Sequence, residues 1–363
     1  MKKIRVMIVD DAVVIRRIVS DVLGADPDIE VAGSAANGKI AIAKLPMIVP
    51  DLVTLDVEMP EMDGIQTLRE LRKVYPKLPV IMFSTLTARG AASTFDALAA
   101  GASDYVTKPA NVGSVSVAMT RIREELIPKI KALCAPQLTH RATTVQGLQS
   151  RPVFAFRPPV IKHTGPIDRV VIGVSTGGPN ALADVIPALP ADLPVPVLIV
   201  QHMPPVFTRL LAERLDQKSG LHVKEATDGE PISPGTVYIA PGDFHTSLVR
   251  VQGTLRIRLN KEPPENSCRP AVDVLFRSAA AMGPGTLAVV LTGMGQDGLR
   301  GCEAILDSSG RVIAQDEATS VVWGMPGFVA RAGLAEQLVP LSQVAQRITR
   351  LVMEGRSGLR ASA

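Results

Sequence analysis

Carboxylates, a serine and a lysine follow four short apolar runs in the first third of the chain. They are Asp10 and Asp11 after residues 4–9, Asp56 after residues 52–55, Ser84 after residues 80–83 and Lys108 after residues 105–106. If these runs are parallel strands, their carboxyl ends meet at one edge of a sheet. Three carboxylates there repel one another unless a cation joins them, and all-oxygen ligands favour Mg²⁺. A lysine and a hydroxyl beside them would hold an anion on one carboxylate, as phosphoryl transfer requires.

A serine among small residues begins a second candidate site. Gly173-Val174-Ser175-Thr176-Gly177 ends an apolar run at 170–174 and has the form G-x-S-x-G. In a nucleophile elbow of this form the hydroxyl projects and backbone N–H groups face a developing oxyanion. A glycine-rich turn that binds phosphate at a helix N-terminus has the same composition, so both interpretations stay open.

A serine hydroxyl needs a base, and three histidines lie between residues 168 and 350. His202 follows the apolar run at 195–200, so it is expected at the same sheet edge as Ser175. His222 lies in a short apolar stretch and is expected to be structural. His245 follows a Pro-Gly turn and is expected at an exposed rim. His202 is therefore the candidate base.

A base of this kind needs a carboxylate to orient it, and Asp297 follows the apolar run at 287–291 in a glycine-rich loop. The alternative role for Asp297 is the cap of a helix beginning near Gly298. The agreement of three strand ends favours a Ser–His–Asp set made of Ser175, His202 and Asp297.

Apolar runs alternate with amphipathic segments through both halves of the chain, which predicts two α/β domains with doubly wound parallel sheets. In the domain over residues 1–125 the predicted strands are the four runs named above, with helices at 13–23, 65–74, 91–100 and 112–127. In the domain over residues 168–350 the strands are at 170–174, 195–200, 237–240, 287–291 and 312–314, with a helix after Gly298.

The segment between the two predicted domains differs in composition. Residues 126–167 contain no Asp or Glu but six Lys and Arg residues and six prolines. Such a stretch buries little apolar surface, so it is predicted to be a basic, solvated linker. Residues 351–363 are expected to form a tail.

Composition excludes several classes of protein. Hydrophobic residues make up 46% and charged residues 20%, as in a globular protein, and the net charge of +4 is too small to indicate nucleic-acid binding. Cys134, Cys268 and Cys302 have no paired spacing, which argues against a disulfide framework or a zinc knuckle. No apolar run reaches the ~18–20 residues that span a bilayer. A cytoplasmic protein without direct membrane insertion is expected.

Residues 1–125 resemble a response-regulator receiver domain. The motifs are Val9-Asp10-Asp11, Leu55-Asp56-Val57-Glu58-Met59-Pro60, Met62-Asp63-Gly64, Ser84 and Thr107-Lys108-Pro109. The resemblance implies a flavodoxin-like fold in which Asp56 accepts a phosphoryl group from a histidine kinase. It also implies that Asp10, Asp11 and Asp56 hold Mg²⁺ and that Ser84 and Lys108 contact the phosphoryl oxygens.

The second half resembles the catalytic domain of the chemotaxis protein-glutamate methylesterase (CheB) family. The matching stretches are 173–179, 201–204 with Phe207-Thr208, 238–242, 269–276, 291–298, and 314–320 followed by Trp323-Gly324-Met325-Pro326. The chain order Ser, His, Asp differs from the Ser, Asp, His order of α/β-hydrolases. The resemblance implies a Rossmann-like domain without a cofactor, with Ser175 as nucleophile, His202 as base, Asp297 as orienting carboxylate and the Met294 backbone as an oxyanion donor.

The two resemblances together imply a phosphorylation-activated esterase and glutamine deamidase acting on the cytoplasmic domain of methyl-accepting chemoreceptors. The unmodified receiver would cover the catalytic cleft. Asn266-Ser267-Cys268 and Thr246 depart from the family, which often has histidine before Arg269 and methionine after His245. Two alternatives remain: a paralogue acting on another receptor or ester, and a receiver with a binding output such as DNA, for which clustered Lys and Arg are lacking.

Overall fold

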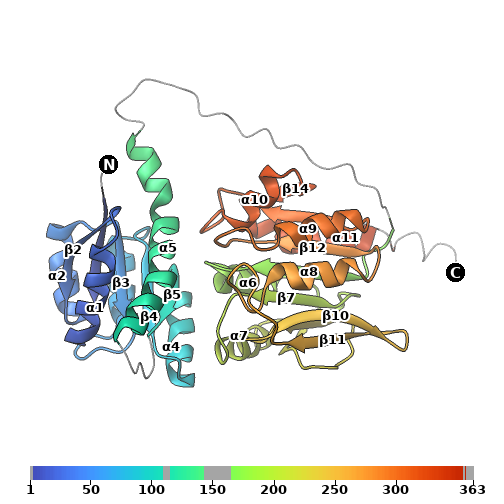
Figure 1. Cartoon of the computed structure of the whole chain (residues 1–363), viewed down its shortest axis with the longest axis horizontal. Helices are drawn as coiled ribbons and strands as arrows, with labels where there is room; N and C mark the ends of the chain where they lie inside the picture. Colours follow the sequence, from blue (N-terminus) through green and yellow to red (C-terminus); the bar gives the residue numbers. More distant parts are fainter. Residues whose placement is uncertain (1–2, 109–114, 143–164, 355, 357–363) are drawn as a thin grey trace. The chain divides into compact units, whose positions relative to one another are not determined.

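The structure, a computed structural model, describes residues 3–108, 115–142, 165–354 and 356. The chain divides into two compact units, Met1–Pro152 and Val153–Ala363 (Figure 1), and each is described by itself. Among the described residues, none of the helices combines the length and the apolar composition that a membrane span requires.

The first unit is a five-stranded parallel sheet in the order β2-β1-β3-β4-β5. Its strands are β1 (Ile4–Val9), β2 (Ile29–Ala35), β3 (Leu52–Asp56), β4 (Val80–Ser84) and β5 (Asp104–Thr107). Its helices are α1 (Val13–Gly24), α2 (Gly38–Ile48), α3 (Gly64–Val74), α4 (Ala88–Ala99) and α5 (Val115–Ala142). α1 packs against α5, and α3 contacts both α2 and α4. The order is that of flavodoxin-like folds, whose ligands lie at the carboxyl ends of the strands.

Helix α5 differs from the prediction, because it continues to Ala142, well into the segment predicted as a linker from residue 126. Pro128 and the lack of acidic residues suggested a tether. The apolar residues Leu126, Ile130, Leu133 and Cys134 recur at helical spacing, however, and all four are buried. Packing of this face stabilises the helix by more than the backbone hydrogen bond that is missing at Pro128 costs. Residues 143–164 of the predicted linker lie outside the described residues. The tail predicted from residue 351 begins later, because helix α11 (Leu341–Glu354) continues to Glu354 and buries Leu351 and Val352; residue 355 and the residues beyond 356 lie outside the described ones.

The second unit is built on a seven-stranded parallel sheet in the order β14-β13-β12-β6-β7-β9-β8. These strands are β6 (Arg169–Val174), β7 (Val197–Gln201), β8 (His222–Glu225), β9 (Thr236–Ile239), β12 (Thr286–Val290), β13 (Arg311–Gln315) and β14 (Gln337–Val339). An antiparallel hairpin adds β10 (His245–Val251) and β11 (Thr254–Asn260). The helices are α6 (Gly178–Val185), α7 (Phe207–Asp216), α8 (Val272–Ala280), α9 (Leu299–Asp307), α10 (Met325–Arg331) and α11 (Leu341–Glu354).

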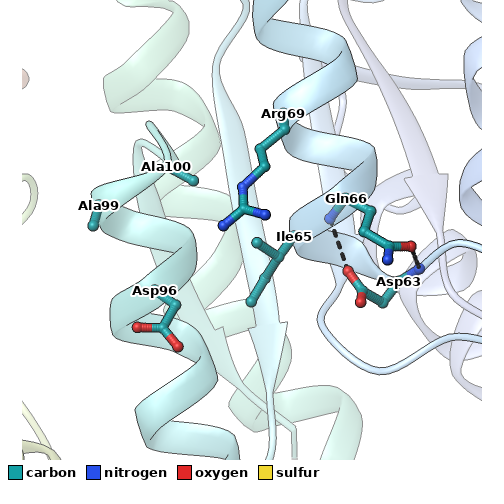
Figure 2. A pocket seen from close by; sticks show the side chains of 7 residues that line it. All are labelled: Asp63, Ile65, Gln66, Arg69, Asp96, Ala99 and Ala100. Atoms are coloured by element: carbon teal, nitrogen blue, oxygen red, sulfur yellow. Dashed lines mark hydrogen bonds between the residues drawn. The ribbon is translucent and has the colours of Figure 1, made fainter.

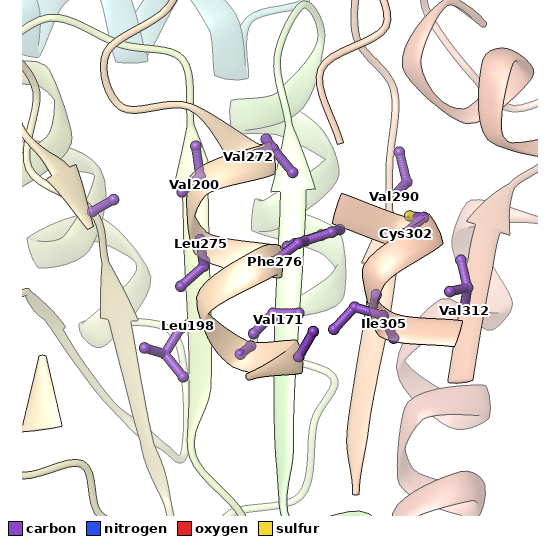
Figure 3. Close-up of a cluster of buried hydrophobic side chains, with 14 of the residues drawn as sticks. Val171, Leu198, Val200, Val272, Leu275, Phe276, Val290, Cys302, Ile305 and Val312 are labelled. Carbon is purple, nitrogen blue, oxygen red and sulfur yellow. The ribbon is translucent and has the colours of Figure 1, made fainter. Parts of the chain in front are cut away.

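Helices α8 and α9 pack closely over the middle of this sheet. Phe276 of α8 is fully buried and points toward α9 (Figure 3), where Gly301 leaves room for it, since a Cβ at Gly301 would lie 2.4 Å from the Phe276 Cβ. Burial of such a side chain stabilises a fold by about 1.5–3 kcal/mol. This packing brings the N-termini of the two helices together at the edge that carries the candidate site. The predicted pair of parallel α/β domains is thus confirmed.

Candidate active site and phosphoacceptor site

A buried imidazole and a buried carboxylate meet at the carboxyl edge of the seven-stranded sheet. His202 directly follows β7, and its Nε2 lies 2.8 Å from Oδ2 of Asp297, in the loop between β12 and α9. Their side chains are 13% and 3% exposed, so solvent screens the pair weakly. Burial lowers the pKa of His202, but the contacts with Asp297 and Cys268 outweigh it and raise the pKa to about 10.

Asp297 also accepts hydrogen bonds from the start of α8, where Val272 N and Asp273 N lie 2.7 and 3.0 Å from its two oxygens. Asp297 therefore caps α8, whereas a cap on its own helix α9 had been the alternative. Asp273 performs that second task, because its Oδ1 accepts from Gly298 N and Gly301 N at 3.0 and 2.6 Å. Each carboxylate faces the positive end of a helix dipole.

Asp297 and Asp273 share one hydrogen-bond donor, but their pKa values are shifted in opposite directions. Asn266 Nδ2 lies 2.9 Å from both Asp297 Oδ1 and Asp273 Oδ2. Burial raises the pKa of Asp297, but the hydrogen bonds with His202 and the α8 backbone outweigh it and lower the pKa. Burial and the neighbouring charge of Asp297 raise the pKa of Asp273. Asp297 is thus the carboxylate that stays ionised beside the imidazole.

Ser175 lies at the end of β6, the strand next to β7. Its N–H donates to Thr292 O (3.0 Å), and His202 N donates to O of Val174 (3.3 Å), the residue that directly precedes Ser175. Gly177, with φ of 77°, then turns the chain into α6. Within the described residues, no hydrogen bond joins the Ser175 hydroxyl to the imidazole. The predicted residues therefore meet at one edge, with His202 and Asp297 in contact and Ser175 beside them.

The glycine loop after β12 lies against Ser175. A Cβ at Gly293 would be 2.8 Å from the Ser175 Cβ, so only glycine fits there. Met294 follows in this loop and is half-buried. The role of its backbone as an oxyanion donor stays a prediction from the sequence.

Sequence reasoning missed Cys268, whose Sγ lies 3.6 Å from Nδ1 of His202. The only signal was its place directly before Arg269, in a segment that departs from the family the sequence resembles. The expectation for His245 was wrong, because this residue is buried, with its Nε2 3.1 Å from Pro263 O. Its Nδ1 accepts from Ala271 N at 3.3 Å, so both ring nitrogens contact the backbone of the segment that follows β11. His222, expected to be structural, is exposed at the start of β8 and lies 3.2 Å from Asp216.

A separate acidic site lies at the carboxyl edge of the five-stranded sheet. Ligating oxygens of Asp10, Asp11 and Asp56 lie within 4.8 Å of one another. Lys108 Nζ is 2.9 Å from Asp10 and 2.7 Å from Asp56. Burial and the charge of Asp10 raise the pKa of Asp56 to about 6 despite the lysine. The excess negative charge and the all-oxygen donors fit Mg²⁺.

Ser84 ends β4 as predicted, but its hydroxyl is already hydrogen-bonded to residues of α4. It donates to Gly90 O (3.0 Å) and accepts from Thr94 Oγ1 (2.6 Å) at the start of α4. A contact with an anion on Asp56 would therefore require this hydroxyl to turn away from α4.

A shallow hollow of about 580 Å³ between α3 and α4 (Figure 2) is lined by Asp63, Gln66 and Arg69, among others. Two of its polar residues already bond each other, because Gln66 N lies 2.7 Å from Asp63 Oδ1 in the capping box of α3. This hollow adds no group to the phosphoacceptor site.

Both units of the chain match families of known proteins. The family described as CheB methylesterase matches residues 170–348, and the response regulator receiver domain matches residues 6–119. A protein-glutamate methylesterase/protein-glutamine glutaminase of Nocardioides sp. is 54% identical over 99% of this chain and 98% of its own length. One from Trichodesmium erythraeum is 51% identical over 97% of this chain and 100% of its own length.

Among solved structures, the Thermotoga maritima CheB methylesterase catalytic domain aligns with a TM-score of 0.51 and 48% identity. It covers 51% of this chain and 99% of that domain. With near full-length relatives and two independent domain matches, this chain belongs to the CheB methylesterase family and carries a response regulator receiver domain.

Proposed function

We propose that this chain is a phosphorylation-regulated protein-glutamate methylesterase and protein-glutamine deamidase of chemoreceptors. The observation that carries the proposal is the buried His202, held by an ionised Asp297 at the strand end next to Ser175. The names of the relatives support the substrate class.

In this mechanism the imidazole works through Nδ1, because Nε2 is already bonded to Asp297. Neutral His202 takes the Ser175 proton at Nδ1 as the hydroxyl attacks the side-chain carbonyl of a methylated glutamate. Backbone donors, Met294 among them, stabilise the oxyanion. His202 returns the proton to the leaving methanol, and water then hydrolyses the acyl-enzyme. An amide substrate releases ammonia by the same steps.

The receiver supplies the regulation. Asp56 attacks the phosphorus of a phosphohistidine on a histidine kinase, so that a P–O bond forms as the P–N bond breaks. Asp10, Asp11 and Asp56 would hold Mg²⁺, which neutralises the charge of the transferring group. Lys108 already contacts two of these carboxylates and would contact the oxygens of the phosphoryl group once it is bound to Asp56.

The test of the whole proposal is methanol release from membranes that carry methylated chemoreceptors, with and without a small phosphodonor and Mg²⁺. Release that rises on phosphorylation is expected. Absence of release under both conditions, with a shift of DNA mobility instead, would favour a binding output.

Deletion of residues 1–142 removes the receiver together with all of α5 and is expected to raise basal methanol release, because the receiver then no longer covers the cleft. The Thermotoga catalytic domain was crystallised without its receiver, so the fragment is expected to fold. The full-length chain without phosphodonor is the control. An unchanged or lower rate in a folded fragment argues against inhibition by the receiver.

The activity is expected to rise with pH from neutrality toward pH 10. The pKa of His202 is raised to about 10, so its base form appears only as pH approaches that value. Cys268→Ala removes one contact that raises this pKa, and the rising limb of kcat/KM should move to lower pH. If kcat/KM rises over the same pH range in the wild type and in Cys268→Ala, Cys268 does not influence the pKa of the base.

A further inference from the structure

Beside the candidate base lies a thiol that the proposed mechanism does not use. Donor atoms of His202, Cys268 and Asp297 all lie within 4.8 Å of one another. Cys268 is half-buried, so ions can reach it from solvent. Imidazole nitrogen and thiolate sulfur are the ligands that Zn²⁺ selects, whereas Mg²⁺ prefers oxygen.

The spacing of the two donors suits one tetrahedral ion. Zn–N bonds of about 2.05 Å and Zn–S bonds of about 2.3 Å at a tetrahedral angle place the nitrogen and sulfur about 3.6 Å apart. The distance from His202 Nδ1 to Cys268 Sγ is 3.6 Å. Asp297 holds the other ring nitrogen at 2.8 Å, the carboxylate–histidine–metal arrangement that orients a metal-binding imidazole.

Cys268 is held in this position by its own turn. Glu265 and Cys268 exchange backbone hydrogen bonds of 3.1 and 2.9 Å across Asn266 and Ser267. These two residues have φ of 52° and 62°, as in a type I′ turn. Glu265 is anchored by two 2.6 Å bonds from Arg277, and Asn266 bonds Asp297. These hydrogen bonds therefore fix the turn that holds the Cys268 thiol beside the imidazole of His202.

We propose that His202 Nδ1 and Cys268 Sγ bind Zn²⁺ or another thiophilic divalent cation, and that this ion reversibly inhibits the enzyme. Binding replaces the thiol proton, and the Nδ1 proton where present, with two Zn bonds, and the protons leave to solvent without oxidation. Water completes the coordination. The ion binds the lone pair of His202 Nδ1, which is then no longer available to accept the Ser175 proton. The inhibition rests on the proposed function, but the binding itself does not.

Binding is tested with Co²⁺ alone as a spectroscopic substitute, on the full chain with excess Mg²⁺ to occupy the receiver carboxylates. A thiolate-to-cobalt charge-transfer band is expected in the wild type and in Cys302→Ala, which removes a thiol buried in the core. The band should be lost in Cys268→Ala and in His202→Ala. Absence of the band in the wild type, or its survival in Cys268→Ala, overturns the proposal.

Inhibition is tested by measuring methanol release at increasing Zn²⁺ concentrations. The rate of each protein is expressed relative to the rate of the same protein without metal. Loss of an outer-shell partner already costs about 10–100-fold in metal affinity, so Cys268→Ala should raise the half-inhibitory Zn²⁺ concentration at least about 10-fold. A chelator that prefers Zn²⁺ to Mg²⁺ should restore the wild-type rate. A cobalt band without Zn²⁺ inhibition overturns the inhibitory claim. A cobalt band in a protein that releases no methanol even without metal would instead count against the proposed function.

Discussion

Ser175→Ala is expected to reduce methanol release by about 10⁴–10⁶-fold, the range of losses when a serine hydrolase loses one member of its triad. The hydroxyl is the atom that forms the acyl-enzyme, and within the described residues it makes no hydrogen bond that holds the fold together. The variant should therefore remain folded and still bind substrate. Single-turnover assays on methylated receptor would measure the residual rate.

The matched control for this variant is Ser247→Ala. Ser247 lies in the β10–β11 hairpin, and its hydroxyl donates to Arg258 O at 3.2 Å on an exposed surface. Its loss should leave the rate within experimental error of wild type. A rate near wild type in Ser175→Ala would exclude Ser175 as nucleophile, even though its strand end faces His202.

Asp56→Asn is expected to remove all stimulation by a phosphodonor. An amide cannot accept the phosphoryl group, and it also removes one of the three carboxylates that would hold Mg²⁺. The ratio of methanol release with and without phosphodonor should fall to about one, and phosphate incorporation should disappear; both follow from the receiver chemistry.

The control is Asp96→Asn, on α4 beside the hollow in Figure 2, which keeps the acidic site intact. This variant should retain both incorporation and stimulation. Phosphate incorporation that persists in Asp56→Asn would place the acceptor elsewhere.

The parts of the fold that could be predicted are those buried on both faces. β1, β3, β4, β6, β7 and β12 are short segments made mostly of apolar residues, and such apolar runs indicate strands in the middle of parallel sheets. β2 and β8 are partly exposed and mix polar with apolar residues, so no run marks them. The β10–β11 hairpin was missed for the same reason, since much of it faces solvent.

The site could be predicted only where the strand-end rule applies. That rule brought Asp10, Asp56 and Lys108 together, and it placed His202 beside Asp297. Residues that reach a site from turns carry no such signal. Asn266 and Cys268 arrive through a turn that tertiary contacts fix, and Asp273 arrives because the N-termini of α8 and α9 lie together.

The central claim is that Ser175 and His202 act as one unit, and a double-variant cycle tests it most directly. When two groups act in the same step, removing the second costs no further rate once the first is gone. The double variant Ser175→Ala/His202→Ala should therefore be no slower than either single variant. The measurement is single-turnover methanol release by all four proteins at one pH. Losses that multiply, with the double variant slower by the product of the two single effects, would mean that His202 and Ser175 act independently and would contradict the proposed mechanism.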